Sequence, residues 1–170
     1  MKVLVTGGCG YIGSHACVAL AAAGHEPIVL DNFSNSNPKA VVRIEKLIGR
    51  PLVVYQGDIR DRLVLDCIFE QHKIGAVMHF AGLKAVGESV AKPLEYYDNN
   101  VSGTLNLLAA MRTAHIYRLI FSSSATVYGD PLTVPISEAA QTGATTNPYG
   151  TSKHMVENCL RDFSAANPDW

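Results

Sequence analysis

Short apolar runs alternate along this chain with longer stretches in which apolar residues recur at helical spacing. Five runs are predicted as strands, at residues 3–5, 27–30, 52–55, 76–80 and 118–121. Five further stretches are predicted as helices, at residues 11–23, 38–48, 60–72, 93–114 and 148–166. Gly24 is a typical helix stop, while Asn147 can cap the last helix and Pro148 suits its first position.

This order of elements predicts an α/β fold. Continuously apolar strands that alternate with helices are typical of a parallel sheet covered on both faces. We therefore expect one Rossmann-like domain over residues 1–170, a doubly wound sheet with strand order 3-2-1-4-5. Ligands bind such sheets at the carboxyl ends of the strands, which is where the unusual residues of this sequence fall.

The composition limits the classes of partner. Hydrophobic residues make up 48% of the chain, charged residues 17%, and the net charge of −1 gives no electrostatic footprint for nucleic acid. No apolar run approaches the roughly 20 residues that span a bilayer, so no membrane partner is expected. The four cysteines form no C-x-x-C pair and fit no zinc spacing with the histidines, so we expect no metal and free thiols in a cytoplasmic protein.

Glycines follow the first predicted strand and open the first predicted helix. Gly7, Gly10 and Gly13 form a G-x-x-G-x-x-G motif within residues 7–13. Glycine allows a tight turn and lets a pyrophosphate approach the backbone at a helix N-terminus, where free N–H groups favour negative charge. A plain turn is the alternative, but the strand before the motif and the helix after it favour a dinucleotide site.

Two aspartates end the next strands. Asp31 follows the second strand, where a carboxylate accepts hydrogen bonds from ribose hydroxyls and repels a 2′-phosphate. No basic residue follows until Lys39, which favours NAD over NADP. Asp58 and Ile59 follow the third strand and are predicted to contact the adenine edge, with an ordinary turn aspartate as the alternative.

Tyr149 precedes Lys153 by four residues in the last predicted helix, so the two side chains share a face. By itself this spacing fits an ordinary amphipathic helix as well as a phenol placed beside an ammonium. A free tyrosine, with a pKa of about 10, is a poor base at pH 7, and a nearby positive charge favours the phenolate. The pair is therefore a candidate acid–base group whose function depends on the rest of the chain.

Three segments together resemble the extended short-chain dehydrogenase/reductase family: the glycines at 7–13, the serines at 122–124, and Tyr149 with Lys153 at the family's Y-x-x-x-K spacing. Within that family the sequence is similar to the UDP-glucose 4-epimerases. FAGLKAVGES at 80–89, PLEYYDNN at 93–100 and SSSATVYGD at 122–130 carry this similarity, which extends over residues 1–170.

The resemblance implies a role for each matching residue. Tyr149 would be the general acid and base, Lys153 its electrostatic partner and a ribose ligand, and Ser124 would hydrogen-bond the sugar hydroxyl, assisted by Thr126. Besides Tyr149 and Lys153, the implied NAD site contains Gly7, Gly10, Tyr11, Ile12, Gly13, Asp31, Asn32, Asn35, Ser36, Asp58, Ile59, Phe80, Ala81, Gly82, Lys84, Asn99 and Ser122.

The implied reaction interconverts UDP-glucose and UDP-galactose by reversible hydride transfer at C4 of the sugar, with NAD as cofactor. Two alternatives are open, an epimerase of another nucleotide sugar and a non-catalytic NAD-binding module. A 4,6-dehydratase is disfavoured because its relatives carry Thr-Asp-Glu where this chain has Ser124, Ala125 and Thr126. The resemblance also implies a homodimer through the helices at 93–114 and 148–166. Because the family is about twice as long, we expect a truncation before the C-terminal substrate domain and weak or no activity from these residues alone.

Overall fold

The computed structural model describes all 170 residues, which form two compact units. The first unit consists of residues 1–81 and 105–122, and the second of residues 82–104 and 123–170. Each unit is therefore built from two separate stretches of the chain.

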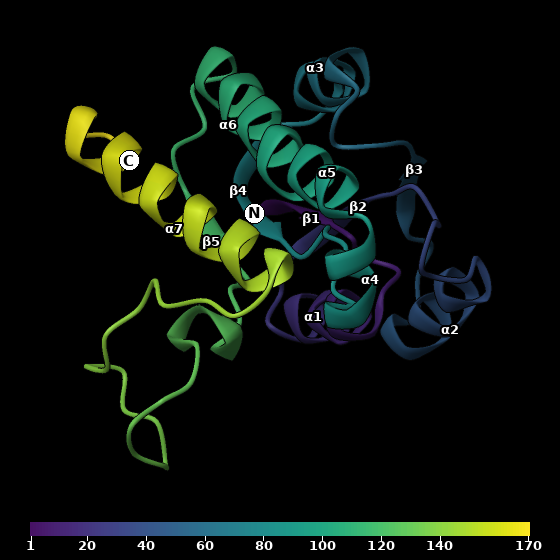
Figure 1. Ribbon diagram of the computed structural model, residues 1–170. Helices are drawn as coiled ribbons and strands as arrows, with labels where there is room; N and C mark the ends of the chain where they lie inside the picture. Colours follow the sequence, from purple (N-terminus) through teal and green to yellow (C-terminus); the bar gives the residue numbers. More distant parts are fainter. The chain divides into compact units, whose positions relative to one another are not determined.

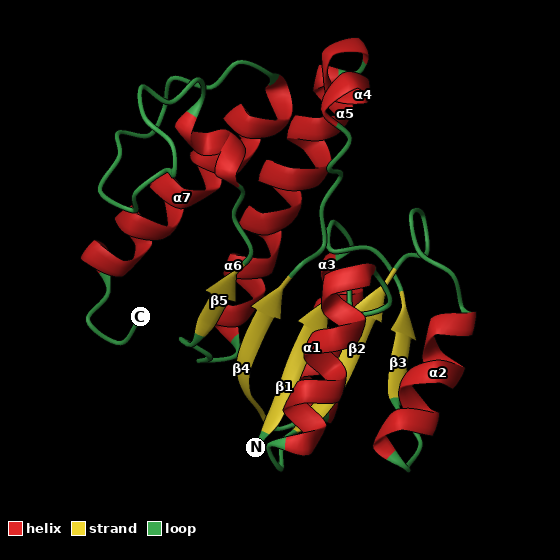
Figure 2. Cartoon of the chain, turned by 90° about the horizontal axis from the view of Figure 1, so that it is seen from below, coloured by secondary structure: helices red, strands yellow, loops and turns green.

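The first unit contains a five-stranded parallel sheet of order β3-β2-β1-β4-β5, which confirms the predicted order (Figures 1 and 2). Its strands are β1 (Lys2–Thr6), β2 (Glu26–Asp31), β3 (Val53–Gln56), β4 (Ile74–His79) and β5 (Leu119–Phe121). The order reverses between β1 and β4, and their carboxyl ends lie side by side, with Thr6 paired to His79. This switch point is where doubly wound sheets bind their ligands.

Helices cover both faces of this sheet. Figure 1 shows α1 (Tyr11–Ala22) and α2 (Lys39–Ile48) on one side, and α3 (Arg62–Gln71) and α6 (Gly103–Thr113) on the other. The core under α1 and α2 is formed by fully buried apolar side chains, which include Val3, Val5, Val29, Cys17 and Ile44. Because the strands alternate their side chains between faces, Leu4, Ile28 and Val77 point to the opposite face, and the apolar residues of α3 and α6 are buried as well.

The second unit is mostly helical. It contains α4 (Val86–Ala91), α5 (Pro93–Tyr96), the π-helical turn η1 (Tyr97–Ser102), the 3-10 turn η2 (Ala125–Tyr128) and α7 (Pro148–Ala166). The Asn147 side chain accepts a hydrogen bond of 2.9 Å from the Gly150 N–H, and Pro148 occupies the first helical position. The predicted start of α7 is thereby confirmed.

Three local predictions were incomplete. The helix predicted at 93–114 is divided, because η1 interrupts regular α-helical bonding between α5 and α6. Sequence reasoning also missed α4 and η2, which are too short for a periodic pattern to reveal. A π-helical turn depends on tertiary contacts of its own residues, and here the Asn100 side chain bonds both backbone groups of Leu83.

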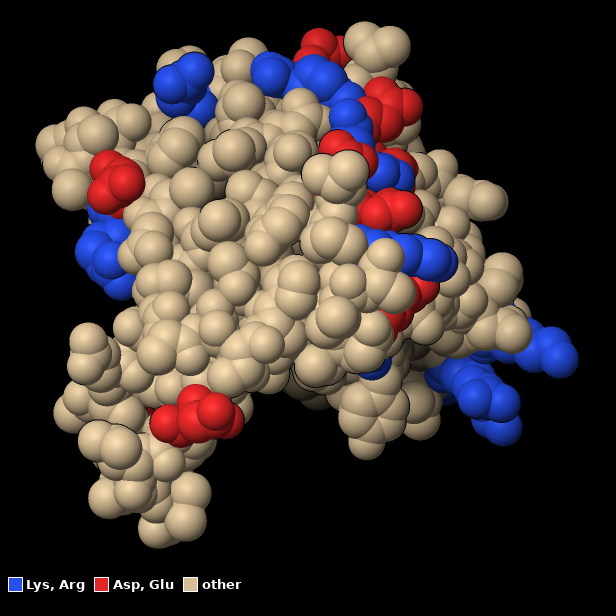
Figure 3. All heavy atoms as spheres, in the orientation of Figure 1, with Lys and Arg blue, Asp and Glu red and all other residues tan.

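Charged side chains are unevenly distributed on the surface. Figure 3 shows basic and acidic groups next to one another in a band at the upper right, a broad uncharged area at the centre of the face drawn, and basic groups that project near α2. No helix combines the length and the apolar character that crossing a membrane requires.

Candidate active site

The glycine motif forms a tight loop between β1 and α1. Gly7 has a positive φ of 67°, and its N–H donates to the Leu30 carbonyl at 2.8 Å. A Cβ on Gly13 would lie 2.3 Å from the Gly7 carbonyl oxygen, closer than any real side chain comes. The first turn of α1 therefore packs directly on the loop, and only glycine fits at both positions.

The N-terminus of α1 offers free hydrogen-bond donors. Its cap residue, Gly10, has no side chain that could accept a bond, and the N–H groups of Tyr11, Ile12 and Gly13 have no protein acceptor. The first regular bond of the helix runs from the Ser14 N–H to the Gly10 carbonyl at 2.9 Å. Three unpaired donors at the positive end of a helix fit the pyrophosphate of a dinucleotide.

Asp31, at the end of β2, is 7% exposed and holds the loop that follows it. One carboxylate oxygen accepts hydrogen bonds from the Phe33 N–H at 2.9 Å and the Ser36 hydroxyl at 2.8 Å. The other accepts from the Cys9 N–H at 2.8 Å. Since a carboxylate has about four acceptor positions, one is left for a ribose hydroxyl. Burial, and then the charge of Asp31, raises the pKa of the Cys9 thiol to about 12, so Cys9 is an inert neutral thiol.

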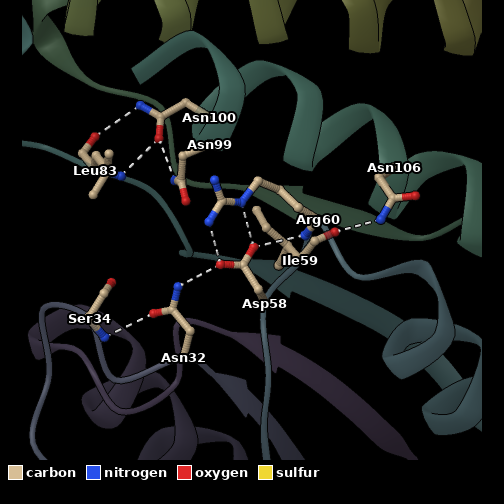
Figure 4. Close-up of polar contacts among 9 residues, drawn as sticks. All are labelled: Asn32, Ser34, Asp58, Ile59, Arg60, Leu83, Asn99, Asn100 and Asn106. Atoms are coloured by element: carbon tan, nitrogen blue, oxygen red, sulfur yellow. Dashed lines mark hydrogen bonds and ion pairs between the residues drawn. The ribbon is translucent and has the colours of Figure 1, made fainter. Parts of the chain in front are cut away.

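Asp58, after β3, is held by Arg60 and Asn32 (Figure 4). Arg60 donates to it through its backbone N–H, Nε and Nη2, each at 2.9 Å, and the Asn32 amide donates at 2.9 Å. The Arg60 side-chain hydrogen bonds are the largest cause that lowers the pKa of Asp58 to about 2. Four donors use the full acceptor capacity of the carboxylate, so an adenine amino group would have to displace one of them.

The peptide of Ile59 is fixed by a residue that sequence reasoning missed. Asn106 on α6 donates from its side-chain amide to the Ile59 carbonyl at 2.7 Å (Figure 4). Ile59 is 4% exposed, and its N–H has no protein acceptor. A buried free N–H beside the sheet's carboxyl edge fits a ring nitrogen of a nucleobase. The polar Asn106 among apolar helix positions was the available signal.

Replacing Arg60 with glutamine is expected to change how stability depends on pH. A lowered pKa means that the Asp58 interactions stabilise the fold fully above about pH 4 and are lost as the pH falls toward 2. The loss of stability caused by Arg60→Gln, measured by urea unfolding, should therefore be largest above pH 4 and shrink below it. Arg43→Gln removes an exposed cation that has no partner and should show no such trend. A constant difference across this pH range would contradict the assignment.

Lys153 and Tyr149 lie one turn apart on α7 in the second unit. Lys153 is 6% exposed, and burial lowers the pKa of its ammonium to about 8. It therefore carries its charge at pH 7, although less firmly than a lysine in water. Tyr149 is half-buried, and its ring meets the edge of the fully buried Tyr96 ring at a centroid distance of 6.5 Å.

Ser124 and Thr126 belong to the same unit and lie against the start of α7. The Ser124 hydroxyl caps η2 and accepts hydrogen bonds from the Thr126 N–H at 3.3 Å and from its hydroxyl at 3.0 Å. A Cβ on Gly150 would lie 2.9 Å from the Thr126 carbonyl oxygen. The glycine after Tyr149 therefore lets η2 approach α7, which brings Ser124 to the helix turn that carries Tyr149.

Gly150→Ala is expected to lower the free energy of unfolding by about 1–3 kcal/mol, because the closest atom to the added methyl group is a backbone oxygen at 2.9 Å, which no side-chain rotation can move away. Alanine normally favours a helix over glycine, so the sign of the effect is informative. Gly87→Ala is the matched control, since its Cβ meets nothing within 4 Å in α4, and it should be neutral or stabilising. Urea unfolding of both variants checks this, and a stabilised Gly150→Ala would refute the close approach.

A network of asparagine side chains supports the region around α7. Asn100 donates to the Leu83 carbonyl at 2.9 Å, and accepts from the Leu83 N–H at 2.8 Å and from the Asn99 amide at 2.9 Å (Figure 4). It also donates to the Ser152 hydroxyl at 3.0 Å. Ser152 in turn donates to the Tyr149 carbonyl at 2.7 Å. Asn100 and Ser152 were not predicted, although two adjacent asparagines in a helix were a usable signal.

The predicted site residues fall into two groups. The first unit holds the glycine loop, Asp31, Asn32, Asn35, Ser36, Asp58, Ile59, Phe80, Ala81 and Ser122. The second holds Gly82, Lys84, Asn99, Ser124, Thr126, Tyr149 and Lys153. In the first unit, the Cβ of a residue replacing Gly7 would lie 2.6 Å from the Ala81 nitrogen, so two predicted positions are in close contact. Asn35 and Lys84 are exposed and make no side-chain bond.

The profile of the NAD dependent epimerase/dehydratase family matches residues 3–169 of this sequence. The chain belongs to this family. The match agrees with the strand order of the sheet. A Rossmann-type epimerase/dehydratase fold is thus established for the described residues.

Curated relatives of the chain are named UDP-glucose 4-epimerase. The protein from Yersinia pestis is 59% identical over 170 residues, and that from Haemophilus influenzae is 56% identical over 168 residues. These alignments cover 100% and 99% of this chain but only 50% of each relative. The chain spans about half the length of the curated relatives it matches, and corresponds to their N-terminal half.

Solved structures of epimerases share the fold. A UDP-glucose 4-epimerase from Bifidobacterium longum in complex with NAD⁺ and UDP is 52% identical, with a TM-score of 0.98 over 100% of this chain and 51% of the other. One from Stenotrophomonas maltophila with bound NAD and formylated UDP-arabinopyranose is 49% identical, with a TM-score of 0.94 over 98% of this chain and 49% of the other.

Proposed function

We propose that this chain is the NAD-binding part of a UDP-glucose 4-epimerase, which interconverts UDP-glucose and UDP-galactose when the remainder of the polypeptide is present. The proposal rests on one observation in the second unit: α7, which bears Tyr149 and the buried Lys153, is in direct contact with η2, which Ser124 caps. The names of the relatives support the substrate, and because the chain spans about half their length, the proposal is limited to a cofactor-binding portion.

The polar groups of the first unit fit NAD. The free N–H groups at the start of α1 would bind the pyrophosphate, and the remaining acceptor position of Asp31 would take a ribose hydroxyl. The free Ile59 N–H would meet the adenine edge. By the sequence resemblance, Asn32, Asn35, Ser36, Phe80, Ala81 and Ser122 of this unit also belong to the proposed cofactor set, as do Gly82, Lys84 and Asn99 of the second unit. When bound, NAD would supply the oxidation and re-reduction of the sugar at C4.

Tyr149 would act as the acid–base group. Its phenol would take the proton of the sugar 4-hydroxyl and later return it. Lys153, one turn away on α7 and charged at pH 7, would be its electrostatic partner. Ser124 would hold the same hydroxyl by hydrogen bonding, and Thr126 would orient Ser124 through its 3.0 Å bond. Burial of Lys153, which is 6% exposed, keeps water away from the ammonium.

The identity of the nucleotide sugar has a specific alternative. The Stenotrophomonas structure carries formylated UDP-arabinopyranose, and a Campylobacter jejuni relative, 39% identical with a TM-score of 0.92, is a UDP-Glc/GlcNAc 4-epimerase. An epimerase of another UDP-sugar is therefore the second candidate function.

Mass spectrometry of the ligand released on denaturing the purified chain tests the cofactor. NAD in the supernatant is expected, and a chain that neither retains NAD nor binds it when added would overturn the proposal. A chimera that joins residues 1–170 to the C-terminal half of the Yersinia pestis relative tests the reaction. It should convert UDP-galactose to UDP-glucose, whereas conversion of UDP-GlcNAc alone would favour the second candidate.

The proposal extends to a homodimer through the segments 93–114 and 148–166. Leu108 and Met111 are fully buried within the first unit, so packing against the sheet accounts for them. Leu105 and Met155 are 39% and 42% exposed and are the apolar contacts such a dimer would use. A cytoplasmic location completes the proposal, supported by four cysteines that are all free.

A further inference from the structure

A groove runs between α1 and α2 on the surface of the first unit. It shares Gly10 and Tyr11 with the proposed NAD site, whereas its lining on α2 lies outside that site. It encloses about 480 Å³, within the range of small-molecule sites. Tyr11, His15 and Val18 line it from α1, and Lys39, Arg43 and Leu47 from α2. These residues recur every three or four positions on each helix, so the groove follows both helix axes. We call this surface the α1–α2 groove.

The charged side chains that line the α1–α2 groove are all positive. Lys39 and Arg43 are exposed and form no ion pair, and no aspartate or glutamate lines the groove. Elsewhere in the chain, exposed cations such as Lys92 and Arg62 are paired with carboxylates, Glu88 and Asp66 respectively. Because Lys39 and Arg43 are four residues apart on α2, they project from the same face of the helix.

The floor of the groove is apolar. Ile44 is 2% exposed at its base, while Leu47 is 71% exposed at one end and Val18 and Ala40 are half-buried between them. At the other end the Tyr11 and His15 rings lie 4.9 Å apart. The His15 Nδ1 lies 2.8 Å from the Tyr11 carbonyl oxygen, which leaves Nε2 free to bond a ligand. A flat apolar body that lies over Val18 and Ile44 would cover the exposed Leu47.

We propose that the α1–α2 groove binds a small organic anion with an aromatic body, such as an aryl phosphate. Lys39 and Arg43 hold the anionic group, and the side chains of Val18, Ile44 and Leu47 cover the ring. Arginine can bind a phosphate through two parallel hydrogen bonds, which makes Arg43 the principal anchor. Binding at the groove requires neither NAD nor turnover.

Titration of 1-naphthyl phosphate into the isotope-labelled 170-residue chain, followed by NMR, tests the proposal. Amide shifts are expected along α1 and α2 at groove positions. The Lys39→Gln/Arg43→Gln double variant should weaken binding about tenfold or more. Lys46→Gln removes the same charge from α2 at a position that does not line the groove, and it should leave the affinity unchanged. Neutral 1-naphthol and inorganic phosphate should each bind more weakly than the combined probe.

Two results would overturn the proposal. One is equal affinity in the double variant and the wild type, which would show that Lys39 and Arg43 hold no anion. The other is a set of shifts centred on Asp58 and Ile59, which would place the probe at the proposed adenine edge. Saturating NAD separates the two sites, because it blocks the adenine edge and leaves the groove lining on α2 free. Failure of NAD binding itself would refute the proposed function without affecting the groove.

Discussion

Gly13→Ala is expected to lower NAD affinity by about 100-fold or more. The added Cβ would lie 2.3 Å from the Gly7 carbonyl oxygen and 2.8 Å from the Gly8 Cα, and both are backbone atoms that no rotamer change can move. The loop must open away from α1, which displaces the Tyr11 and Ile12 N–H groups from the pyrophosphate. Isothermal titration of NAD into the purified variant measures the effect.

The same substitution should lower the free energy of unfolding by about 1–3 kcal/mol through overpacking. Gly87→Ala again provides the control, because it adds the same methyl group in a helix with open space around it. It should bind NAD as the wild type does. If Gly13→Ala retains an affinity within twofold of the wild type, the loop does not hold the pyrophosphate.

Tyr149→Phe should reduce turnover of UDP-galactose by about 10³-fold in the chimera with the C-terminal half of the Yersinia pestis relative. A positioned acid–base group typically increases the rate by about 10²–10⁴-fold. Phenylalanine lacks only the hydroxyl group that carries the proton and keeps the ring. The ring contact with Tyr96 at 6.5 Å remains, so packing is kept. Initial rates at saturating substrate and the amount of NAD per protein are the two measurements.

NAD content of the Tyr149→Phe chimera should match that of the unmodified chimera, which separates loss of chemistry from loss of cofactor. Tyr97→Phe is the matched control, since this half-buried tyrosine of η1 makes no side-chain hydrogen bond. It should retain nearly full turnover. More than a tenth of the normal rate in Tyr149→Phe would assign the proton transfer to another group.

The fold could be predicted because its signals are local. Short apolar runs that are each followed by a helix produce a parallel sheet, and the rules for such connections allow only a few strand orders. The observed strand order is the expected one. The glycines were also readable, because Gly7 and Gly13 occupy backbone positions that exclude side chains. Helix boundaries shifted by one or two residues, as at α3, which begins at Arg62 because the Asp61 side chain caps it.

The hydrogen bonds that hold the site residues and their neighbours in place could not be predicted from the sequence. Arg60 clamps Asp58, and Asn106 holds the Ile59 carbonyl from 47 residues away. Asn100 bonds Leu83 across 17 residues and lies inside a π-helical turn where a continuous helix was expected. These hydrogen bonds depend on contacts between segments that are distant in the sequence, and the spacing of apolar residues does not predict such contacts.

The sequence alone determined the fold class, the strand order and which residues are candidates for the site. The spacing of apolar residues, the glycine motif and the Tyr149–Lys153 spacing are properties of short segments, so they can be read without the structure. The tertiary structure decided the environment of those groups. It buried Lys153 and lowered its pKa to about 8, filled the acceptor positions of Asp58, and left Lys39 and Arg43 unpaired over an apolar groove. Desolvation and hydrogen-bond saturation arise from distant residues brought together, so only the folded chain defines them.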